Sequence, residues 1–407
     1  MKSVIEALES RRLLSAGPTG WYTVDDYQYP SSTNLARQTA LAKDAAGNLF
    51  AAGFATDPSG RQHGIVREKL AGSTSWNTIL DYNNAQLTSA AVSPDGTLYV
   101  GGESGGGGGI VLALAPGATQ PTLVDSSQFS TVNGLLSDAA GNVFAAGSSS
   151  IVTKPNHTTA YFIVREKPAG QSSFHTVDSV ANGSGNGINV VPTGASAGLY
   201  AVGHIVLNNR ENWLVRKSAD GGATWATVDN FNYDGLHGSN AGGITGDGKG
   251  NVFVSGAGSA FNPNSTTASS NHWLVRESSD GGQTWRMADD WQPEAGGASA
   301  PGYGAIGLDG GGNVCVAGYG AQNRIAHAIV RSNSGVNGAF VTIDDYQLAP
   351  NTASANYSFI SDNAGASYAG GGMIDASGAS HWVTRDPPAP GAPIHGHRVH
   401  HNHHPAH

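Results

Sequence analysis

A short pattern that recurs along the chain constrains its fold more than any other feature. In each copy, a glycine turn is followed by a strand of small and apolar residues that ends on a second glycine. The seven copies lie about fifty residues apart, at 47–53, 96–102, 141–147, 198–203, 250–256, 312–318 and 365–371. A unit of this size cannot bury a hydrophobic face alone, so the units must stack and share a continuous core.

A second pattern follows each copy after a variable loop. An arginine ends a short apolar run in six copies, and Leu112 takes its place in the remaining one; the arginines are Arg67, Arg165, Arg216, Arg276, Arg331 and Arg385. A bulky residue follows nine positions later, at Trp76, Phe174, Trp225, Trp285 and Phe340, with Pro121 as the exception. An aspartate comes about four residues after that, in an unbroken column of Asp81, Asp125, Asp178, Asp229, Asp289 and Asp344. We expect the arginine and aspartate of each repeat to pair across adjacent antiparallel strands as part of the scaffold.

The last repeat has no bulky residue followed by an aspartate after Arg385, and the N-terminal part of the chain supplies both. Trp21 and Asp25 have the same four-residue spacing as the bulky residue and aspartate of the other repeats. A strand at 21–27 would therefore complete the last repeat and close a ring without a free edge. We predict an all-β fold, a seven-bladed β-propeller whose last blade is closed by the N-terminal strand. Strands A to D of a blade are expected to be of the types 243–245, 251–256, 213–216 and 225–229.

The composition agrees with many short strands joined by turns. Glycine accounts for 58 of 407 residues and charged residues for 13%, which suits strands better than helices. The formal net charge of −9 argues against nucleic acid or an anionic membrane as the main partner.

Cys315 is the single cysteine, so no intrachain disulfide or multi-cysteine metal site is possible, and we expect a buried, inert thiol.

Two octapeptides fit the pattern S-x-D-x-G-x-T-W. Their defining residues are Ser218, Asp220, Gly222 and Trp225 in one copy and Ser278, Asp280, Gly282 and Trp285 in the other. Asp and Ser side chains can bond nearby backbone amides, Gly allows a tight turn, and Trp anchors the next strand. The pattern resembles the Asp-box of BNR-type β-propellers of sialidase-like architecture, and the glycine-turn strands resemble the SBBP propeller repeat. The resemblance implies that both octapeptides are structural turns between strands C and D.

The first twenty residues lie apart from the repeats. Residues 8–15 resemble the LEPR-type motif (L-E-x-R-x-L-L-S) found near the start of many large bacterial surface or exported proteins, with Ser10 in place of the usual Pro. The resemblance implies export to the cell surface or beyond; the alternative is a short frayed amphipathic segment. No apolar run is long enough to span a bilayer. We therefore divide the chain into a targeting-type segment at 1–20, the propeller at 21–386 and a tail at 387–407.

The tail begins with a Pro-rich linker and continues with a histidine-rich tract. Such a tract binds Ni²⁺, Cu²⁺ or Zn²⁺ in solution. The candidate metal ligands are His400, His401, His403 and His404. The alternative is a solvated, disordered tail. We expect no cofactor other than such an adventitious metal.

Loops that differ between blades are the expected place for a ligand, because function on a rigid scaffold usually lies there. The connections from strand D to the next strand A begin with an aromatic residue beside an acid or amide, at Tyr27, Tyr82, Phe231, Trp291 and Tyr346. These rings could stack on sugars or peptide side chains, or cover backbone between blades. A further polar column lies four residues before the arginine, at His63, Tyr161, Asn212, His272, His327 and His381, and is expected to form hydrogen bonds at strand edges rather than a metal site.

Three classes of function remain open. We expect a non-catalytic, exported, monomeric propeller that binds glycans or proteins at the cell surface or outside the cell. One alternative is a sialidase-like glycoside hydrolase, which would need a cluster of carboxylates in the central funnel. The F/Y-R-I-P motif that accompanies the first sialidase arginine is absent, so no catalytic residue is carried over from that family. The other alternative is a structural repeat protein of a surface layer.

Overall fold

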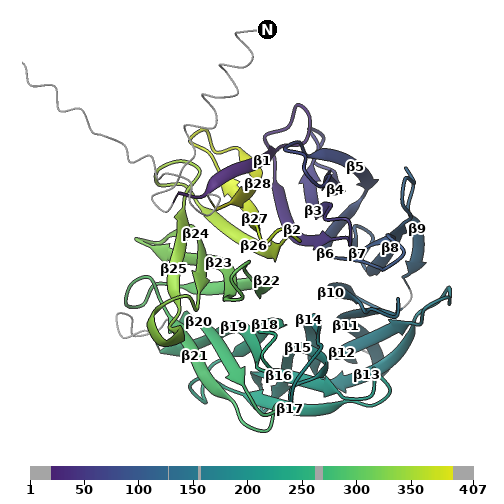
Figure 1. Cartoon of the computed structure of the whole chain (residues 1–407), viewed down its shortest axis with the longest axis vertical. Coiled ribbons are helices and arrows are strands. Elements are labelled where there is room, and N and C mark those ends of the chain that lie inside the picture. The colour runs from purple at the N-terminus through teal and green to yellow at the C-terminus, as the bar shows by residue number, and fades with distance from the viewer. Residues whose placement is uncertain (1–19, 127, 155–156, 262–268, 388–407) are drawn as a thin grey trace, which may run out of the picture.

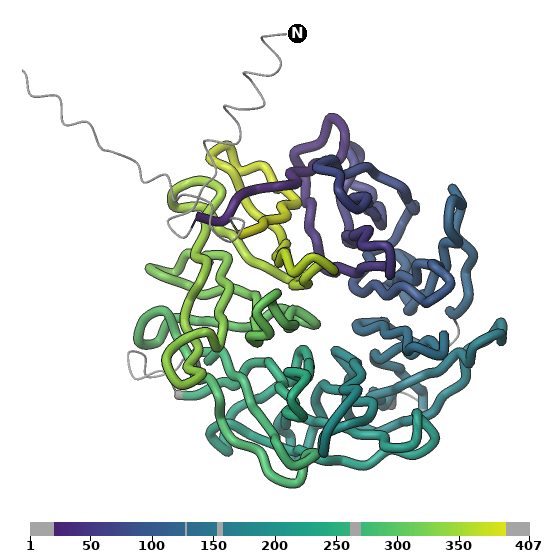
Figure 2. Tube along the Cα trace, in the orientation of Figure 1, coloured from purple at the N-terminus to yellow at the C-terminus, as the bar shows by residue number. Residues whose placement is uncertain are grey.

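Seven four-stranded antiparallel sheets stand around a central axis (Figures 1 and 2). The computed structural model describes residues 20–387 apart from 127, 155–156 and 262–268. In these residues the one helical element is a 3₁₀ turn, η1 (Val336–Gly338), and no helix is long and apolar enough to cross a membrane. The predicted seven-bladed β-propeller is confirmed.

Each blade has strands A to D, counted outward from the axis. Blade 1 contains β2 (Ala36–Lys43), β3 (Leu49–Thr56), β4 (Gln62–Lys69) and β5 (Asn77–Asn83); blade 2, β6 (Ala85–Val92), β7 (Leu98–Ser104), β8 (Gly109–Leu114) and β9 (Thr122–Asp125); blade 3, β10 (Thr131–Ser137), β11 (Val143–Lys154), β12 (His157–Lys167) and β13 (His175–Ala181). Blade 4 contains β14 (Gly183–Val191), β15 (Gly198–Leu207), β16 (Arg210–Ser218) and β17 (Ala226–Phe231); blade 5, β18 (Ser239–Gly246), β19 (Val252–Phe261), β20 (Ser269–Ser278) and β21 (Arg286–Trp291). Blade 6 contains β22 (Ser299–Leu308), β23 (Val314–Gln322), β24 (Ile325–Ser332) and β25 (Val341–Tyr346); blade 7, β26 (Ser354–Ser361), β27 (Ser367–Ile374), β28 (Ser380–Asp386) and β1 (Tyr22–Tyr27).

The N-terminal strand closes the ring, as predicted. In Figure 1, β1 lies beside β28 at the end of the chain, and the two strands pair antiparallel from Tyr22 opposite Asp386 to Tyr27 opposite Trp382. The imidazole Nδ1 of His381 on β28 lies 2.6 Å from a carboxylate oxygen of Asp26 on β1. Both ends of the described chain are thereby held in one blade.

The strands extend further than the sequence predicts. Strand β18 covers Ser239–Gly246 instead of 243–245, and β16 covers Arg210–Ser218 instead of 213–216. Polar residues and glycines continue the hydrogen-bonded ladders beyond the apolar core of each strand. Because they lack an apolar pattern, the sequence gives no signal for these extensions.

A bulge in every strand A explains the glycine that ends each repeat. The register shifts by extra residues in all seven A strands, and in each blade the repeat-ending glycine of strand B lies opposite the residue before the shift. These residues are Gly53, Gly102, Gly147, Gly203, Gly256, Gly318 and Gly371. A Cβ atom there would lie within 2.3 Å of a backbone oxygen of strand A in every case. The bulges therefore require glycine at this position.

The core lies between neighbouring blades. Val66 of blade 1 and Val100 of blade 2, for example, belong to one buried cluster. Cys315 is fully buried, and burial raises the pKa of its thiol to about 12. The expected buried thiol is confirmed, and at neutral pH it stays protonated.

Candidate functional site

The two faces of the propeller carry different loops. The B–C loops and the D–A connections form one face, called here the upper face, while the A–B and C–D turns form the lower face. Both octapeptides lie at C–D turns, between β16 and β17 and between β20 and β21. They therefore lie on the face opposite to the D–A connections.

The two octapeptide turns have the same internal hydrogen bonds. The amide of Gly222 donates to Ser218 Oγ at 2.8 Å, and the amide of Thr224 donates to Asp220 Oδ1 at 2.9 Å. Trp225 Nε1 donates to the carbonyl of Gly222 at 3.1 Å. The second copy, with Ser278, Asp280, Gly282 and Trp285, repeats these contacts. The hydroxyl and amide of Thr224 lower the pKa of Asp220 to about 2, so its carboxylate serves the turn itself.

The five aromatic residues predicted as ligand contacts lie on outer strands, at five different blade junctions. An arginine of the next blade covers four of them, with its Cζ atom 3.6–4.7 Å from the ring centroid. The pairs are Tyr27 with Arg67, Phe231 with Arg276, Trp291 with Arg331 and Tyr346 with Arg385. Tyr82 packs on the apolar cluster between blades 1 and 2. The structure does not bring these residues together in one site, and their contact with a ligand remains a prediction.

Each of the six arginines pairs with an aspartate of the preceding blade. Arg385 Nε and Nη2 each lie 3.0 Å from a carboxylate oxygen of Asp344, and both side chains are fully buried. The other pairs are Arg67 with Asp25, Arg165 with Asp125, Arg216 with Asp178, Arg276 with Asp229 and Arg331 with Asp289. The predicted pairing within one blade is wrong because the aspartate stands opposite the residue before the arginine, as Asp229 does opposite Val215. It therefore faces the next blade.

The aspartate column is broken at one junction, contrary to the prediction. Leu80 lies opposite Val66 on strand C, in the register where the other blades have the aspartate, and Asp81 is displaced by one position. The arginine position at the same junction is Leu112, and both leucines are buried in one cluster. An apolar contact thus replaces the ion pair between blades 1 and 2.

The four histidines of the predicted polar column form hydrogen bonds within their own blades, as predicted. Nδ1 of each histidine on strand C lies 2.6–2.8 Å from an aspartate oxygen on strand D or its equivalent. The pairs are His63 with Asp81, His272 with Asp290, His327 with Asp345 and His381 with Asp26. No group of three or more His, Cys, Asp or Glu side chains within the described residues could hold a metal ion. The candidate ligands His400, His401, His403 and His404 lie outside the described residues.

The bulged residues of the inner strands link successive blades. In blades 1 to 4 this residue is Thr or Asn, and its side chain donates a hydrogen bond to a carbonyl of the next inner strand. The donors and acceptors are Thr39 to Leu87, Thr88 to Val132, Asn133 to Gly185 and Asn186 to Ala241. In blades 5 to 7 the bulges instead contain Gly242, Tyr303 and Tyr357. Blades 5 to 7 therefore form a sector of the ring in which Thr and Asn are replaced by glycine and tyrosine at the bulges.

Two glycines make room for the tyrosines of this sector. A Cβ atom on Gly242 would lie 3.0 Å from the Tyr303 ring, and one on Gly302 would lie 2.7 Å from the backbone of Tyr357. Blade 6 also has a longer bulge than the others, because four residues separate Pro301 from Ile306 in the pairing register. Tyr303 is consequently 53% exposed although it comes from an inner strand.

A cleft of about 370 Å³ opens on the upper face in this sector. Its walls include Tyr303 and Tyr319 of blade 6 and Tyr357 of blade 7, and Glu211 reaches it from blade 4. The amides in its walls are Asn240, Asn271 and Asn356. The volume is within the range of small-molecule sites, and aromatic rings beside a few polar groups are typical of such sites. This cleft is the candidate functional site.

The polar groups of the cleft are only partly paired. Asn240 Nδ2 donates to the Tyr303 hydroxyl at 3.2 Å. Asn356 is fully buried, and its Oδ1 atom has no donor within the described residues. Burial raises the pKa of Tyr303, with the charge of Glu211 as a second cause, and burial also raises the pKa of Tyr319. Both hydroxyls therefore remain protonated near neutral pH and can donate hydrogen bonds.

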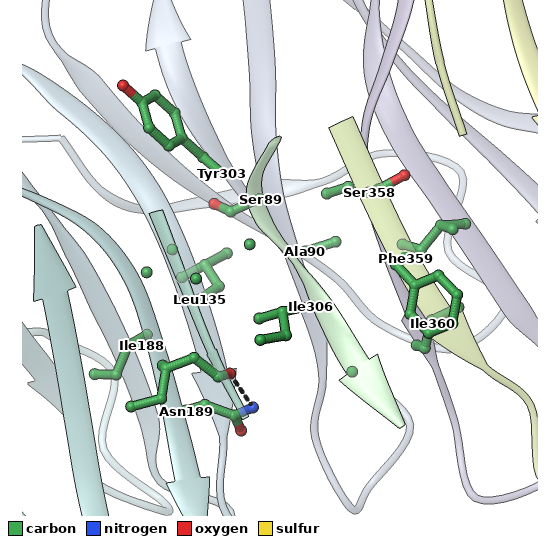
Figure 3. Close-up of a pocket in the computed structure, with 18 of the residues that line it drawn as sticks. Ser89, Ala90, Leu135, Ile188, Asn189, Tyr303, Ile306, Ser358, Phe359 and Ile360 are labelled. Atoms are coloured by element: carbon green, nitrogen blue, oxygen red, sulfur yellow. Dashed lines mark hydrogen bonds between the residues drawn. The ribbon is translucent and has the colours of Figure 1, made fainter. Parts of the chain in front are cut away.

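The cleft adjoins the central channel at Tyr303. The channel has a volume of about 440 Å³ and is lined by residues of all seven inner strands, including Tyr303. Figure 3 shows Tyr303 at one end of the view, with Ile188 and Asn189 at the other. Between them, apolar side chains such as Leu135 and Ile306 line the channel (Figure 3).

The sequence analysis missed the three cleft tyrosines. They come from three strands, β22, β23 and β26, so no single segment contains the site. Tyr303 lies between two glycines in an inner strand, and Tyr357 takes a position that is Thr or Asn in blades 1 to 4. These departures from the repeat were the available signal.

Comparison with known proteins supports the fold. No protein-family description and no curated protein sequence match the chain. The solved WD40 β-propeller domain of Doa1 has a TM-score of 0.51 and 12% identity over 89% of this chain and 96% of that chain. A protein of unknown function from Dyadobacter fermentans has a TM-score of 0.51 and 13% identity over 90% and 98% of the two chains. The periplasmic gluconolactonase PpgL of Pseudomonas aeruginosa has a TM-score of 0.51 and 13% identity over 82% and 94%. At such identities the similarity shows the β-propeller fold alone.

Proposed function

We propose that the protein is a non-catalytic, exported propeller that binds a glycan in the upper-face cleft. The observation that carries this proposal is the convergence of three tyrosines and three side-chain amides in the walls of one cleft. Aromatic faces pack on the apolar faces of sugar rings, and a sugar hydroxyl is a suitable donor to an amide oxygen.

Binding is favoured over hydrolysis by the carboxylates of the cleft. Glycoside hydrolysis generally uses two carboxyl groups about 5–10 Å apart, one of them as a proton donor. Of the described residues that line the cleft, Glu211 is the one acid, and its side chain is exposed. We therefore assign Glu211 to ligand contact rather than to catalysis. Action at the cell surface or outside the cell rests on the LEPR-type motif at residues 8–15.

The test is a titration of the full chain with a panel of oligosaccharides by calorimetry. Tyr303→Ala and Tyr319→Ala should each weaken glycan binding about tenfold or more, because removal of one stacking ring costs on the order of 1–3 kcal/mol. Tyr22→Ala is the matched control, since Tyr22 lies on the outer strand β1 and is 37% exposed. Equal affinities for the three variants would place the ligand elsewhere.

Product analysis on the same panel separates binding from hydrolysis. Intact oligosaccharides after prolonged incubation are expected for a binding protein. Shortened products that disappear in Glu211→Gln would instead support a glycoside hydrolase. An absence of binding to the whole panel would contradict the proposal and favour a structural repeat protein of a surface layer.

A further inference from the structure

Arg37 lies against Tyr357, a wall residue of the cleft, and has no counter-ion among the described residues. It lies on the inner strand β2 of blade 1, and its side chain covers part of blade 7. The Cζ atom is 4.6 Å from the ring centroid of Tyr357, a wall residue of the cleft, and 5.8 Å from that of Phe54. The guanidinium is therefore held between two aromatic rings next to the proposed glycan site.

The guanidinium donors of Arg37 have no acceptor among the described residues. The Nε atom is buried and has no hydrogen-bond partner among the described residues. The ion pairs of the described arginines do not include Arg37. The arginines at the blade junctions differ sharply, since Arg385, for example, binds both oxygens of Asp344. A half-buried donor group that remains unpaired is unfavourable unless an acceptor comes from outside the protein.

The fold does not require a cation at this position. The same register in the other six inner strands is occupied by uncharged residues, namely Gln86, Thr131, Ser184, Asn240, Ala300 and Ala355. Arg37 is thus an addition to one blade, at the place where its side chain reaches Tyr357.

We infer that Arg37 is the anion subsite of the cleft and that the ligand is an acidic glycan. This inference rests on the proposed function, because the sugar ring must occupy the tyrosine cleft for its acidic group to reach Arg37. Arginine presents a planar fork of donors that fits two oxygens of a carboxylate or sulfate group. Stacking on Tyr357 fixes the plane of that fork before the ligand arrives. The shared chemistry is an anionic group of two or more oxygens on a sugar adjoining Tyr357.

Arg37→Gln tests this inference with a residue that the fold already accepts, since Gln86 occupies the same register in blade 2. Three classes of oligosaccharide of equal length are titrated: one neutral, one containing uronic acid and one sulfated. The unchanged protein should prefer an acidic class about tenfold or more over the neutral class. Arg37→Gln should abolish this preference and leave affinity for the neutral class unchanged. The class that loses more affinity identifies the group as carboxylate or sulfate.

The outcomes separate this inference from the proposed function. Equal affinity of the unchanged protein for all three classes, with loss of binding in Tyr303→Ala, would overturn the acidic preference and leave glycan binding standing. An acidic preference that persists in Arg37→Gln would also overturn the role of Arg37. Failure to bind any of the three classes would overturn both. Thermal melting of Arg37→Gln should match that of the unchanged protein, and a large fall would make Arg37 part of the scaffold.

Discussion

Leu80 of blade 1 and Leu112 of blade 2 occupy the two positions that hold an aspartate and an arginine at the other six blade junctions. Both leucines are buried, 4% and 1% exposed. Because both charged partners are missing together, neither is left as a buried, uncompensated charge. The ion pair is therefore one of two interchangeable ways to join blades, and it is not a requirement of the ring.

A double-mutant cycle at this junction should show that the two positions are coupled. Leu112→Arg alone places a charge in an apolar cluster and should lower the free energy of unfolding by about 3–5 kcal/mol. Leu80→Asp alone should also be destabilising. The double variant should recover part of the loss, with a coupling of about 1–3 kcal/mol, measured by urea unfolding. Additive losses in the double variant would contradict an interchangeable joint.

At the junction of blades 6 and 7, removal of one partner of the buried ion pair should lower the free energy of unfolding. Arg385→Ala leaves Asp344 buried and removes the hydrogen bond from Arg385 Nη2 to the carbonyl of Trp21. The free energy of unfolding should fall by about 3–5 kcal/mol, as observed when one partner of a buried ion pair is removed. Arg61→Ala is the control, because Arg61 is exposed on a B–C loop and should change stability by less than about 0.5 kcal/mol. Equal melting temperatures for the two variants would contradict a scaffold role.

Ring closure should depend on pH through His381. Its hydrogen bond to Asp26 raises the pKa of His381 above the ordinary value of 6.5. A raised folded-state pKa means that the imidazolium contributes its full stability below the unfolded pKa and loses it as pH rises through the folded pKa. His381→Gln should therefore be destabilised most near pH 6 and progressively less toward pH 9, in urea unfolding at each pH.

The control for this pH dependence lies at the same register in blade 4. Asn212 Nδ2 donates to Asn230 Oδ1 at 3.1 Å, and neither side chain titrates in this range. Asn212→Ala should therefore lower stability by the same amount at each pH. A constant loss in His381→Gln, parallel to that of Asn212→Ala, would show that protonation of His381 does not contribute to closure.

The repeat made the number of blades and the closure predictable, whereas the contacts between blades were not. Sequence spacing places Asp229 near Arg216 of its own blade, but the strand register turns it toward Arg276 of the next. Exact spacing does distinguish Leu80 from Asp81, because Leu80 lies four residues after Trp76, as Asp229 lies four residues after Trp225, whereas Asp81 lies five residues after Trp76. An approximate spacing of four residues conceals this difference.

The candidate site was less predictable than the scaffold for a related reason. Repeats reveal what the blades share, while Tyr303, Tyr319 and Tyr357 are departures from the repeat on different strands. Their approach depends on Gly242 and on the long bulge of blade 6, which are visible only when the strand pairing is known. The role of Arg37 likewise depends on contacts that the sequence does not reveal, namely its stacking on Tyr357 and the lack of a counter-ion among the described residues.

Two neighbouring glycines of the first octapeptide should respond differently to alanine. Gly221 and Gly222 both have positive φ, +74° and +104°, so alanine is strained at either position. A Cβ atom on Gly221 meets nothing within 4 Å, whereas one on Gly222 would lie 2.9 Å from the Phe144 ring. Gly221→Ala should cost about 1–2 kcal/mol from the backbone alone, and Gly222→Ala should cost more. Equal unfolding midpoints in urea would show that Phe144 yields to the new methyl group.

Shortening the bulge of blade 6 should remove the candidate site and keep the scaffold. Blade 5 closes its bulge with the single residue Gly242, and deletion of Tyr303 together with Gly304 would leave Gly302 in the equivalent role. Because Tyr303 is 53% exposed, little buried apolar area is lost, and the melting temperature should change by only a few degrees. Glycan binding should fall below detection, since the deletion removes an aromatic wall and the hydroxyl that accepts from Asn240. A folded deletion variant that still binds the same glycan with unchanged affinity would move the site away from the cleft, whereas loss of binding in a protein of normal stability would assign recognition to the departures from the repeat.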